Sequence, residues 1–345
     1  MSNQYVIVPQ NYRSDSMVSI SPADKRYFEQ AQAKQKSPPQ QMMFGGYSPS
    51  PSLQKTLSTQ LSEQSIDEFG KMQKDSDTEL VVQYILQLRD TEKREQALSE
   101  LSKKRESFPH LAPLLWHSVG TIAIFLQEIA VVYQHLQPAQ LTPAQSSRIC
   151  SVLGLLQCLA LHVQTRSCFL RAHIPLFLYP FLNTSNKSKA FENLRVTSLG
   201  VIGALVKGDD PEAINFLMQT EIIPLCLRIM KKGQELSRTV ATFIVQKILL
   251  DDNGLNYICQ TPERFFAVSQ VLQTMIDDLH QSQKDDQRLL RHIIRCYLRL
   301  SENQKAGEVL KKYLPQVLKD PTQSFIKDEV VKKWHNNLLQ NLSIK

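Results

Sequence analysis

The chain has 345 residues, a formal net charge of +7 and a hydrophobic fraction of 42%. This length suffices for one large or two ordinary domains, and the slightly low hydrophobic fraction indicates that part of the chain is not packed. The positive charge permits an anionic partner without requiring one. Because the N-terminus is polar and no apolar run reaches about 18 residues, we expect no signal peptide and no membrane span. These features predict a soluble intracellular protein.

The six cysteines are spread through apolar helical patterns and form no CxxC pair. This usage is typical of buried free thiols in a reducing compartment. They are Cys150, Cys158, Cys168, Cys226, Cys259 and Cys296.

Residues 1–75 differ in composition from the rest of the chain. They are rich in Ser, Gln and Pro, and their few apolar residues show no period. Such a segment cannot bury enough surface to offset its chain entropy, so we predict a disordered extension. Its Ser-Pro pairs at Ser37, Ser48 and Ser50 are candidate sites for proline-directed kinases.

From residue 76 to the C-terminus, apolar residues recur at helical spacing, and no alternating strand pattern is present. Helices are predicted to begin near Thr78 and Thr142-Pro143, where Thr142 is a suitable N-cap and Pro143 a suitable first residue. Further helices are predicted over 93–105, 113–133, 264–280, 289–300, 303–313 and 330–342.

The stretch 191–260 holds three apolar helices in a row, the first two separated by a polar break. An Ile-Pro-Leu-x-Leu unit occurs at Pro175 and again at Pro224, 49 residues later, and the helices that follow correspond at a spacing of about 41. Periods of about 40 to 47 residues with two or three helices are typical of armadillo and HEAT repeats. We therefore predict an all-α, armadillo-type helical-repeat solenoid of about six repeats over residues 76–345.

Three glycines have structural interpretations. Gly200 and Gly203 lie in the middle of a predicted helix, where each costs about 1 kcal/mol relative to alanine. Close approach of a neighbouring helix would explain them. Gly254, at the end of the last apolar helix, suits a left-handed C-cap.

No residue pattern indicates catalysis. Asp251 and Asp252 are adjacent and would point about 100° apart on a helix, so they do not converge on a metal. The sequence contains no HExxH, P-loop or Gly-x-Ser-x-Gly motif. Cys168 or Cys226 could act as a nucleophile only beside a histidine, and nothing local supplies one. His117, His162 and His173 are interpreted as packed or capping residues. We predict no enzyme activity, no metal and no cofactor.

The remaining candidate for function is surface. Third helices of an armadillo array line a concave groove, and here they carry five cations. This groove would suit an acidic or extended peptide, or single-stranded nucleic acid, although the same cations could simply solvate their helices. The five are Arg195, Lys207, Lys247, Arg295 and Arg299.

Four runs resemble a known family: 172–182, 197–207, 246–252 and 295–301. They are similar to the RCD ("required for cell differentiation") family, the armadillo-repeat subunit of the CCR-NOT mRNA deadenylase complex. The resemblance extends from about Leu80 to the C-terminus.

The resemblance implies a non-catalytic adaptor for deadenylation and translational repression. One surface would dock on the large scaffold subunit, through His117, Val119, Ala123 and Ala130. Val119 and Ala130 stand where the family would carry a larger aromatic residue and a valine.

The resemblance also implies two further surfaces. A concave groove for helical peptides of RNA-binding regulators would involve Val240, Thr239 and Phe243. Convex pockets for tryptophans of silencing proteins would involve Pro262, Arg264 and Lys305; here Pro262 replaces a tyrosine and Lys305 an arginine. Losing an aromatic wall should weaken stacking on an inserted indole.

We therefore expect an adaptor in the cytoplasm, with the nucleus as a second location. The alternative is a transcriptional cofactor that binds single-stranded nucleic acid through a basic groove. Homodimerisation is left open.

Overall fold

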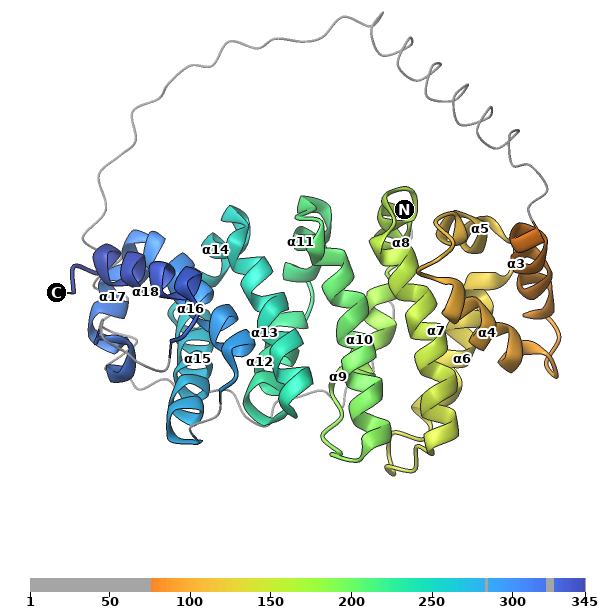
Figure 1. Cartoon of the computed structure of the whole chain (residues 1–345), viewed down its shortest axis with the longest axis horizontal. Helices are drawn as coiled ribbons and strands as arrows, with labels where there is room; N and C mark the ends of the chain where they lie inside the picture. The colour runs from red at the N-terminus through yellow and green to blue at the C-terminus, as the bar shows by residue number, and fades with distance from the viewer. Residues whose placement is uncertain (1–75, 283–284, 321–325, 345) are drawn as a thin grey trace, which may run out of the picture. The chain divides into compact units, whose positions relative to one another are not determined.

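The computed structural model describes residues 76–282, 285–320 and 326–344 (Figure 1). Throughout these ranges the secondary structure is helical, with 16 α-helices, two 3-10 segments and no strand. The predicted disorder of residues 1–75 lies outside the described residues. The described helices divide after Lys247 into two compact units, and each unit is described by itself. The single 76–345 domain stays a prediction.

The first unit runs from α3 to most of α13. Its elements are α3 (Ser76–Gln87), α4 (Arg94–Lys104), α5 (Leu111–His117), α6 (Thr121–Tyr133), α7 (Pro143–Leu161), α8 (Val163–Arg171), η1 (Ile174–Leu178), α9 (Tyr179–Leu182), α10 (Lys189–Lys207), α11 (Pro211–Met218), α12 (Ile222–Lys232) and α13 (Glu235–Leu250).

The second unit begins at Ile248, in the last turn of α13. Its further elements are α14 (Asp252–Cys259), α15 (Pro262–Ser282), α16 (Gln287–Glu302), α17 (Gln304–Tyr313), η2 (Gln316–Leu318) and α18 (Glu329–Asn341).

The helices follow one another in groups of three, each closed by a long helix. The groups within the described ranges end at α7, α10, α13 and α16, with α3–α4 before them and α17–α18 after. In the first unit α7 lies between α4 and α10 (Figure 1). Because α7 and α10 each pack on two sides, their apolar residues are buried around most of the helix. Two incomplete and four complete groups match the predicted count of about six.

The helix predicted over 113–133 is two helices. α5 and α6 meet at a bend of 88°, with Gly120 at the corner. Gly120 has φ +88°, a conformation that glycine adopts without steric cost. Ser118 ends α5, and its hydroxyl donates to the Leu114 carbonyl over 2.6 Å. The apolar run continues across this bend, so periodicity alone did not reveal it.

The polar break after Lys207 contains a helix that was not predicted. α11 begins at Pro211, and the Asp210 side chain accepts a hydrogen bond from the Glu212 amide over 3.0 Å. An aspartate N-cap followed by proline at the first helical position was the available signal. The group closed by α13 is therefore α11–α12–α13, and α10 closes the group before it.

Gly254 does not end a helix in a left-handed conformation. It lies in the first turn of α14, whose N-cap is Asp251; the Asp251 carboxylate accepts from the Gly254 amide over 3.0 Å. A Cβ atom at Gly254 would lie 1.9 Å from the Ile248 carbonyl oxygen. Glycine is required here because two backbone segments approach closely.

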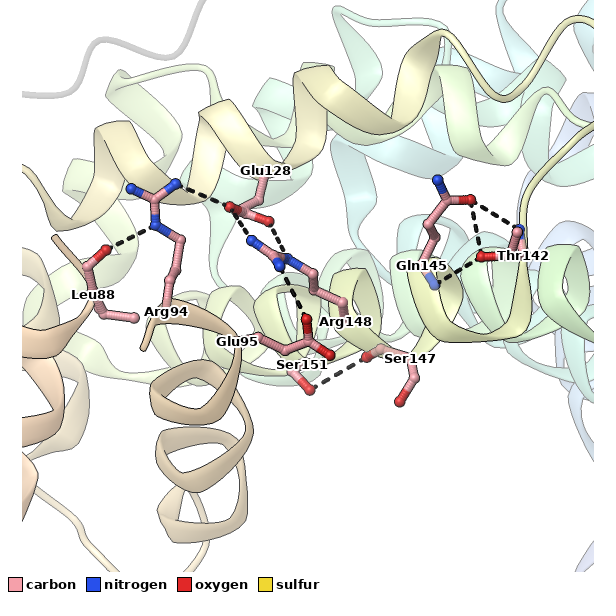
Figure 2. Close-up of polar contacts among 9 residues, drawn as sticks. All are labelled: Leu88, Arg94, Glu95, Glu128, Thr142, Gln145, Ser147, Arg148 and Ser151. Carbon is pink, nitrogen blue, oxygen red and sulfur yellow. Dashed lines mark hydrogen bonds and ion pairs between the residues drawn. The ribbon is translucent and has the colours of Figure 1, made fainter. Parts of the chain in front are cut away.

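Helix α7 begins with the N-cap expected at Thr142, which is also part of a capping box. The Thr142 hydroxyl accepts from the Gln145 amide over 3.2 Å, and the Gln145 side chain accepts from the Thr142 amide over 3.0 Å (Figure 2).

By length and composition α7 could cross a membrane, and the bent pairs α5–α6 and α11–α12 could each do so as one span. The expectation that no such run exists was therefore wrong, although α7 is packed between α4 and α10.

A buried carboxylate joins α4, α6 and α7. Glu128 of α6 is 9% exposed and pairs with Arg148 at 2.7 Å and with Arg94 at 3.3 Å (Figure 2). Arg94 also donates to the Leu88 carbonyl over 2.8 Å, and Arg148 pairs with Glu95 at 3.1 Å. Burial alone would raise the pKa of Glu128, but hydrogen bonds and charge from the two arginines outweigh it and lower that pKa. Glu128 is therefore the ionised centre that three helices share.

We predict that Glu128→Gln lowers the free energy of unfolding by about 3 kcal/mol, because it leaves two arginines partly buried without their shared counter-charge. Urea titration followed by circular dichroism would measure the change. Glu95→Gln is the matched control: Glu95 is exposed and binds the same Arg148, so its loss should cost less than about 1 kcal/mol.

The same pair of variants should differ with pH. Folding lowers the pKa of Glu128, so its stabilising contribution is complete above the ordinary carboxyl pKa and is lost as the pH falls below it. The stability difference between wild type and Glu128→Gln should therefore shrink on acidification from pH 7 to about pH 3. Equal losses for Glu128→Gln and Glu95→Gln would show that the buried network has no special role.

Candidate protein-binding surfaces

The exposed residues of α6 are apolar apart from Gln127. Phe125, Ile129 and Val132 are buried, whereas Ala123 and Ala130 are exposed and Val131 is 53% exposed. An amphipathic helix in a monomer normally presents polar residues to solvent. The exposed face of α6 therefore has the composition of a contact surface.

The bend before α6 extends this surface. Val119 is 82% exposed, and Arg89, in the turn that follows α3, donates to its carbonyl over 3.1 Å, so the loop backbone is anchored. His117 is exposed at the end of α5. The four residues predicted for scaffold docking are thus all exposed: two lie on α6, one on the bend before it and one at the end of α5. Val131, which the prediction omitted, belongs to the same helix surface.

A neighbouring apolar element was also missed by the sequence reasoning. Leu176 and Phe177 of η1 are 39% and 38% exposed. The Tyr133 hydroxyl at the end of α6 donates to the Phe177 carbonyl over 2.6 Å, which ties η1 to α6. No local sequence signal distinguishes these two side chains from core residues, because both stand in a continuous apolar run.

The residues predicted for the peptide groove lie on α13. Val240 and Phe243 are half-buried, and Leu236, one turn before Val240, is 50% exposed. Their spacing of i, i+4 and i+7 places them on one face of the helix. Thr239 does not share this face: it is 4% exposed and its hydroxyl donates to the Glu235 carbonyl over 2.9 Å. Leu236 therefore replaces Thr239 as a candidate contact residue.

Close helix approach does not account for the glycines of α10. A Cβ atom at Gly203 would lie 3.8 Å from Phe243 and 4.0 Å from Val240, which is ordinary van der Waals contact. At Gly200 the nearest atom would be the end of the Gln157 side chain, at 3.6 Å. Alanine would fit at both positions, so the expectation of a steric requirement was wrong.

The residues predicted for tryptophan pockets are only partly accessible. Pro262 is buried at the first position of α15, so it offers no wall to an inserted indole. The Arg264 guanidinium covers the Tyr257 ring, 3.8 Å from its centroid, and donates to the Tyr257 carbonyl over 3.1 Å. Lys305 of α17 is half-buried. Weak binding of tryptophans at these positions stays a prediction.

Arg195, predicted to line the basic groove, is buried. This residue is 3% exposed, and its guanidinium pairs with Glu192 at 2.9 Å and donates to the Thr184 hydroxyl over 3.1 Å. Arg195 is a core residue whose charge is compensated within its own helix. It cannot contact an anionic ligand at the surface.

Two further cations of the predicted groove are neutralised. Lys247 pairs with Asp209 at 2.6 Å, within the first unit. In the second unit Arg299 pairs with both Asp252 and Glu302 and donates to the Leu249 carbonyl over 3.0 Å. Lys207 is exposed and Arg295 is half-buried. Three of the five cations are therefore buried or ion-paired, and a nucleic-acid groove lined by all five stays a prediction.

Two of the cysteines and one of the histidines considered for chemistry have structural surroundings. Cys226 and Cys259 are buried, and burial raises the pKa of each thiol to about 12. His162 caps α8, because its ring nitrogen accepts from the Gln164 amide over 3.2 Å. Over the described ranges, no group of three or more His, Cys, Asp or Glu side chains could hold a metal ion.

Comparison with known proteins supplies relatives of this chain. "Cell differentiation protein rcd1" of Schizosaccharomyces pombe is 59% identical over 266 residues, which cover 76% of this chain and 93% of the relative. "Protein CAF40" of Saccharomyces cerevisiae is 54% identical over 254 residues, covering 73% of this chain and 68% of the relative. Neither name designates an enzyme.

Solved structures of designed armadillo repeat proteins have the same fold. One, in complex with the peptide (KR)4, superposes with a TM-score of 0.56 at 15% sequence identity. Another, computationally designed for modular peptide recognition, has a TM-score of 0.58 at 16% identity. Each comparison covers 75% of this chain and 98% of the designed chain. The predicted all-α, armadillo-type solenoid is confirmed.

The family model described as "Cell differentiation family, Rcd1-like" matches residues 84–342. This range includes all four of the runs that resembled the family, and the two relatives align over 266 and 254 residues. The chain therefore belongs to the Rcd1-like cell differentiation family.

Proposed function

We propose that the protein is a non-catalytic adaptor subunit of the CCR-NOT mRNA deadenylase complex. It docks on the large scaffold subunit through α6 and holds RNA-associated regulators at the groove along α13. In this way it couples messages bound by regulators to poly(A) shortening and translational repression. We place it in the cytoplasm, with the nucleus as a second location.

The exposed apolar face of α6 is the observation that carries this proposal. Val119, Ala123 and Ala130 are accessible to solvent, whereas the residues on the opposite side of α6 are buried in the core. Small residues at a surface allow another helix to approach closely, and the adjacent Val131 adds apolar area. This combination fits a partner that buries α6 over much of its length.

The groove along α13 supports the second part of the proposal. Leu236, Val240 and Phe243 have the i, i+4 and i+7 spacing with which a helix receives the apolar side of another helix. Gly203 of α10 lies next to Val240 and Phe243, and because it has no side chain it leaves space beside them. Designed proteins of the same fold recognise peptides, in agreement with a peptide-binding role.

Scaffold docking should depend on the small side chain at Ala123. We predict that Ala123→Tyr reduces co-purification with the scaffold subunit by about tenfold or more, because a bulky ring holds the partner away from α6. Quantitative pull-down with the purified scaffold subunit would measure the loss. The residue is exposed, so circular dichroism should be unchanged.

Val163→Tyr is the matched control for that experiment. Val163 is 81% exposed at the start of α8, so the same added bulk there should leave docking intact. Normal capture of Ala123→Tyr by the scaffold subunit would refute docking through α6.

Peptide binding should depend on the apolar stripe of α13. We predict that Val240→Glu weakens binding of an amphipathic helical peptide from an RNA-binding regulator by about tenfold or more, because a carboxylate would be desolvated in an apolar contact. Fluorescence anisotropy with a labelled peptide would measure the dissociation constant. Val240 is half-buried, so thermal unfolding should be followed alongside.

The control for the groove is Leu86→Glu on α3. Leu86 is 57% exposed, and the change introduces the same charge outside α13. Scaffold capture should survive Val240→Glu, and peptide binding should survive Ala123→Tyr. If Val240→Glu and Leu86→Glu bound the peptide equally well, the groove would not be its site.

A further inference from the structure

Three arginines on one face of α16 form no ion pair with any residue that the structure describes. Arg288, Arg291 and Arg295 are spaced i, i+3 and i+7, which places them along one side of the helix. Arg288 and Arg291 are exposed and Arg295 is half-buried. Within the part of the second unit that the structure describes, none of the three forms an ion pair, so their charges are available to a ligand.

Other cations of this unit are neutralised by nearby carboxylates. Arg299, on the same helix, pairs with Asp252 and Glu302. Lys327 pairs with Asp285 at 2.5 Å, and Lys332 of α18 pairs with Glu329 at 2.7 Å. Against this background, the three arginines of α16 are a distinct cluster of uncompensated charge.

Trp334 of α18 holds two of the arginines in place. The guanidinium of Arg295 lies 5.0 Å from the centroid of the indole ring, and that of Arg291 lies 5.4 Å from it. Helices α16 and α18 pack against each other, so the contact is part of the fold. Cation–π contact restricts two flexible side chains without using their N–H donors, which lowers the entropy cost of binding an anion.

The lowered pKa of His292 in α16 is consistent with the positive potential of the three arginines. His292 is half-buried between Arg291 and Arg295 in the sequence of α16. Burial lowers its pKa, and the charges of Arg288 and Arg291 lower it further, to about 4, against a smaller opposing effect of Asp286. His292 is therefore neutral near pH 7 and adds no charge of its own.

We propose that Arg288, Arg291, Arg295 and Trp334 form a binding surface for a short acidic peptide segment of a partner protein. Arg288 and Arg295 are seven residues apart, about 10 Å along the helix axis. Carboxylates on alternate residues of an extended peptide are about 7 Å apart, so two or three of them would match the cluster. This surface is separate from the residues of α6 and α13 in the proposed function.

Two observations favour a short acidic peptide over nucleic acid. Asp286 precedes the cluster at the N-cap of α16, and Glu302 follows it at the last residue of that helix. A long polyanion would meet these carboxylates at both ends, whereas a short segment fits between them. In addition, two guanidinium groups already contact the indole, so a base would have to displace them to stack on that face.

The test uses the full chain and a fluorescein-labelled peptide of four Ser-Glu repeats. Fluorescence anisotropy would measure its affinity beside that of a peptide of four Ser-Gln repeats and a single-stranded DNA of 12 nucleotides. We expect the acidic peptide to bind more tightly than both, and its affinity to fall as salt is raised. Equal binding of the two peptides, or tighter binding of the DNA, would overturn the proposal.

Arg288→Glu combined with Arg291→Glu should weaken binding of the acidic peptide by about tenfold or more, because charge-assisted hydrogen bonds are lost. Lys231→Glu combined with Lys232→Glu is the matched control: both lysines are exposed on α12, and the net charge changes equally. Arg291→Lys keeps the charge but loses the planar fork, so an intermediate loss is expected. An equal loss in the α12 control would show only a general charge effect and would refute the assignment.

The location can be checked in a Trp116→Phe background. The chain has two tryptophans, so this substitution leaves Trp334 as the only one. The unlabelled acidic peptide should then change the intrinsic tryptophan emission at the concentration at which the labelled peptide binds. Binding without any change in that emission would place the peptide elsewhere.

Discussion

The packing of each third helix on two sides is the constraint from which the other features of this protein follow. α10 shows it most clearly, because Leu194 and Leu199 are both fully buried and point about 140° apart around one helix. Each such side chain contributes about 1.5–3 kcal/mol when removed from water. Two-sided burial restricts the exposed part of these helices to one side. Contact with other proteins therefore falls to that side, as proposed for α13 and α16, and to shorter helices such as α6.

The fold could be predicted from sequence wherever the signal was local. Thr142 and Pro143 marked the start of α7, because a hydroxyl N-cap and a proline act within one turn. Gly120 gave no comparable signal, since a glycine within an apolar run indicates a bend only when its φ is known. Asp210-Pro211 carried a readable cap, but the helix that follows has only 8 residues, too few for a clear helical period. The failures were at corners, where one backbone angle decides the path of the chain.

The candidate sites were less predictable, because accessibility and charge compensation depend on residues far apart in sequence. The carboxylate that neutralises Lys247 is 38 residues away, and the one on Arg299 is 47 residues away. Arg195 could be interpreted as a surface cation until its burial against Glu192 was seen. The exposed face of α6 was anticipated through family resemblance, whereas Leu236 and Val131 needed the structure. An arginine in a repeat protein is therefore informative only together with its neighbours.

The two glycines of α10 have a consequence for how stability is distributed in the first unit. Alanine would fit at Gly200 and Gly203, yet the helix forgoes about 1 kcal/mol of backbone stability at each position. That deficit of about 2 kcal/mol must be made up by the apolar seams that α10 shares with its neighbours. One side of this helix, at the glycines, thus has space for a larger side chain, whereas the buried side chains on its other sides are closely packed. Its tolerance to sequence change should differ sharply around its circumference, permissive at the glycines and strict along the seams.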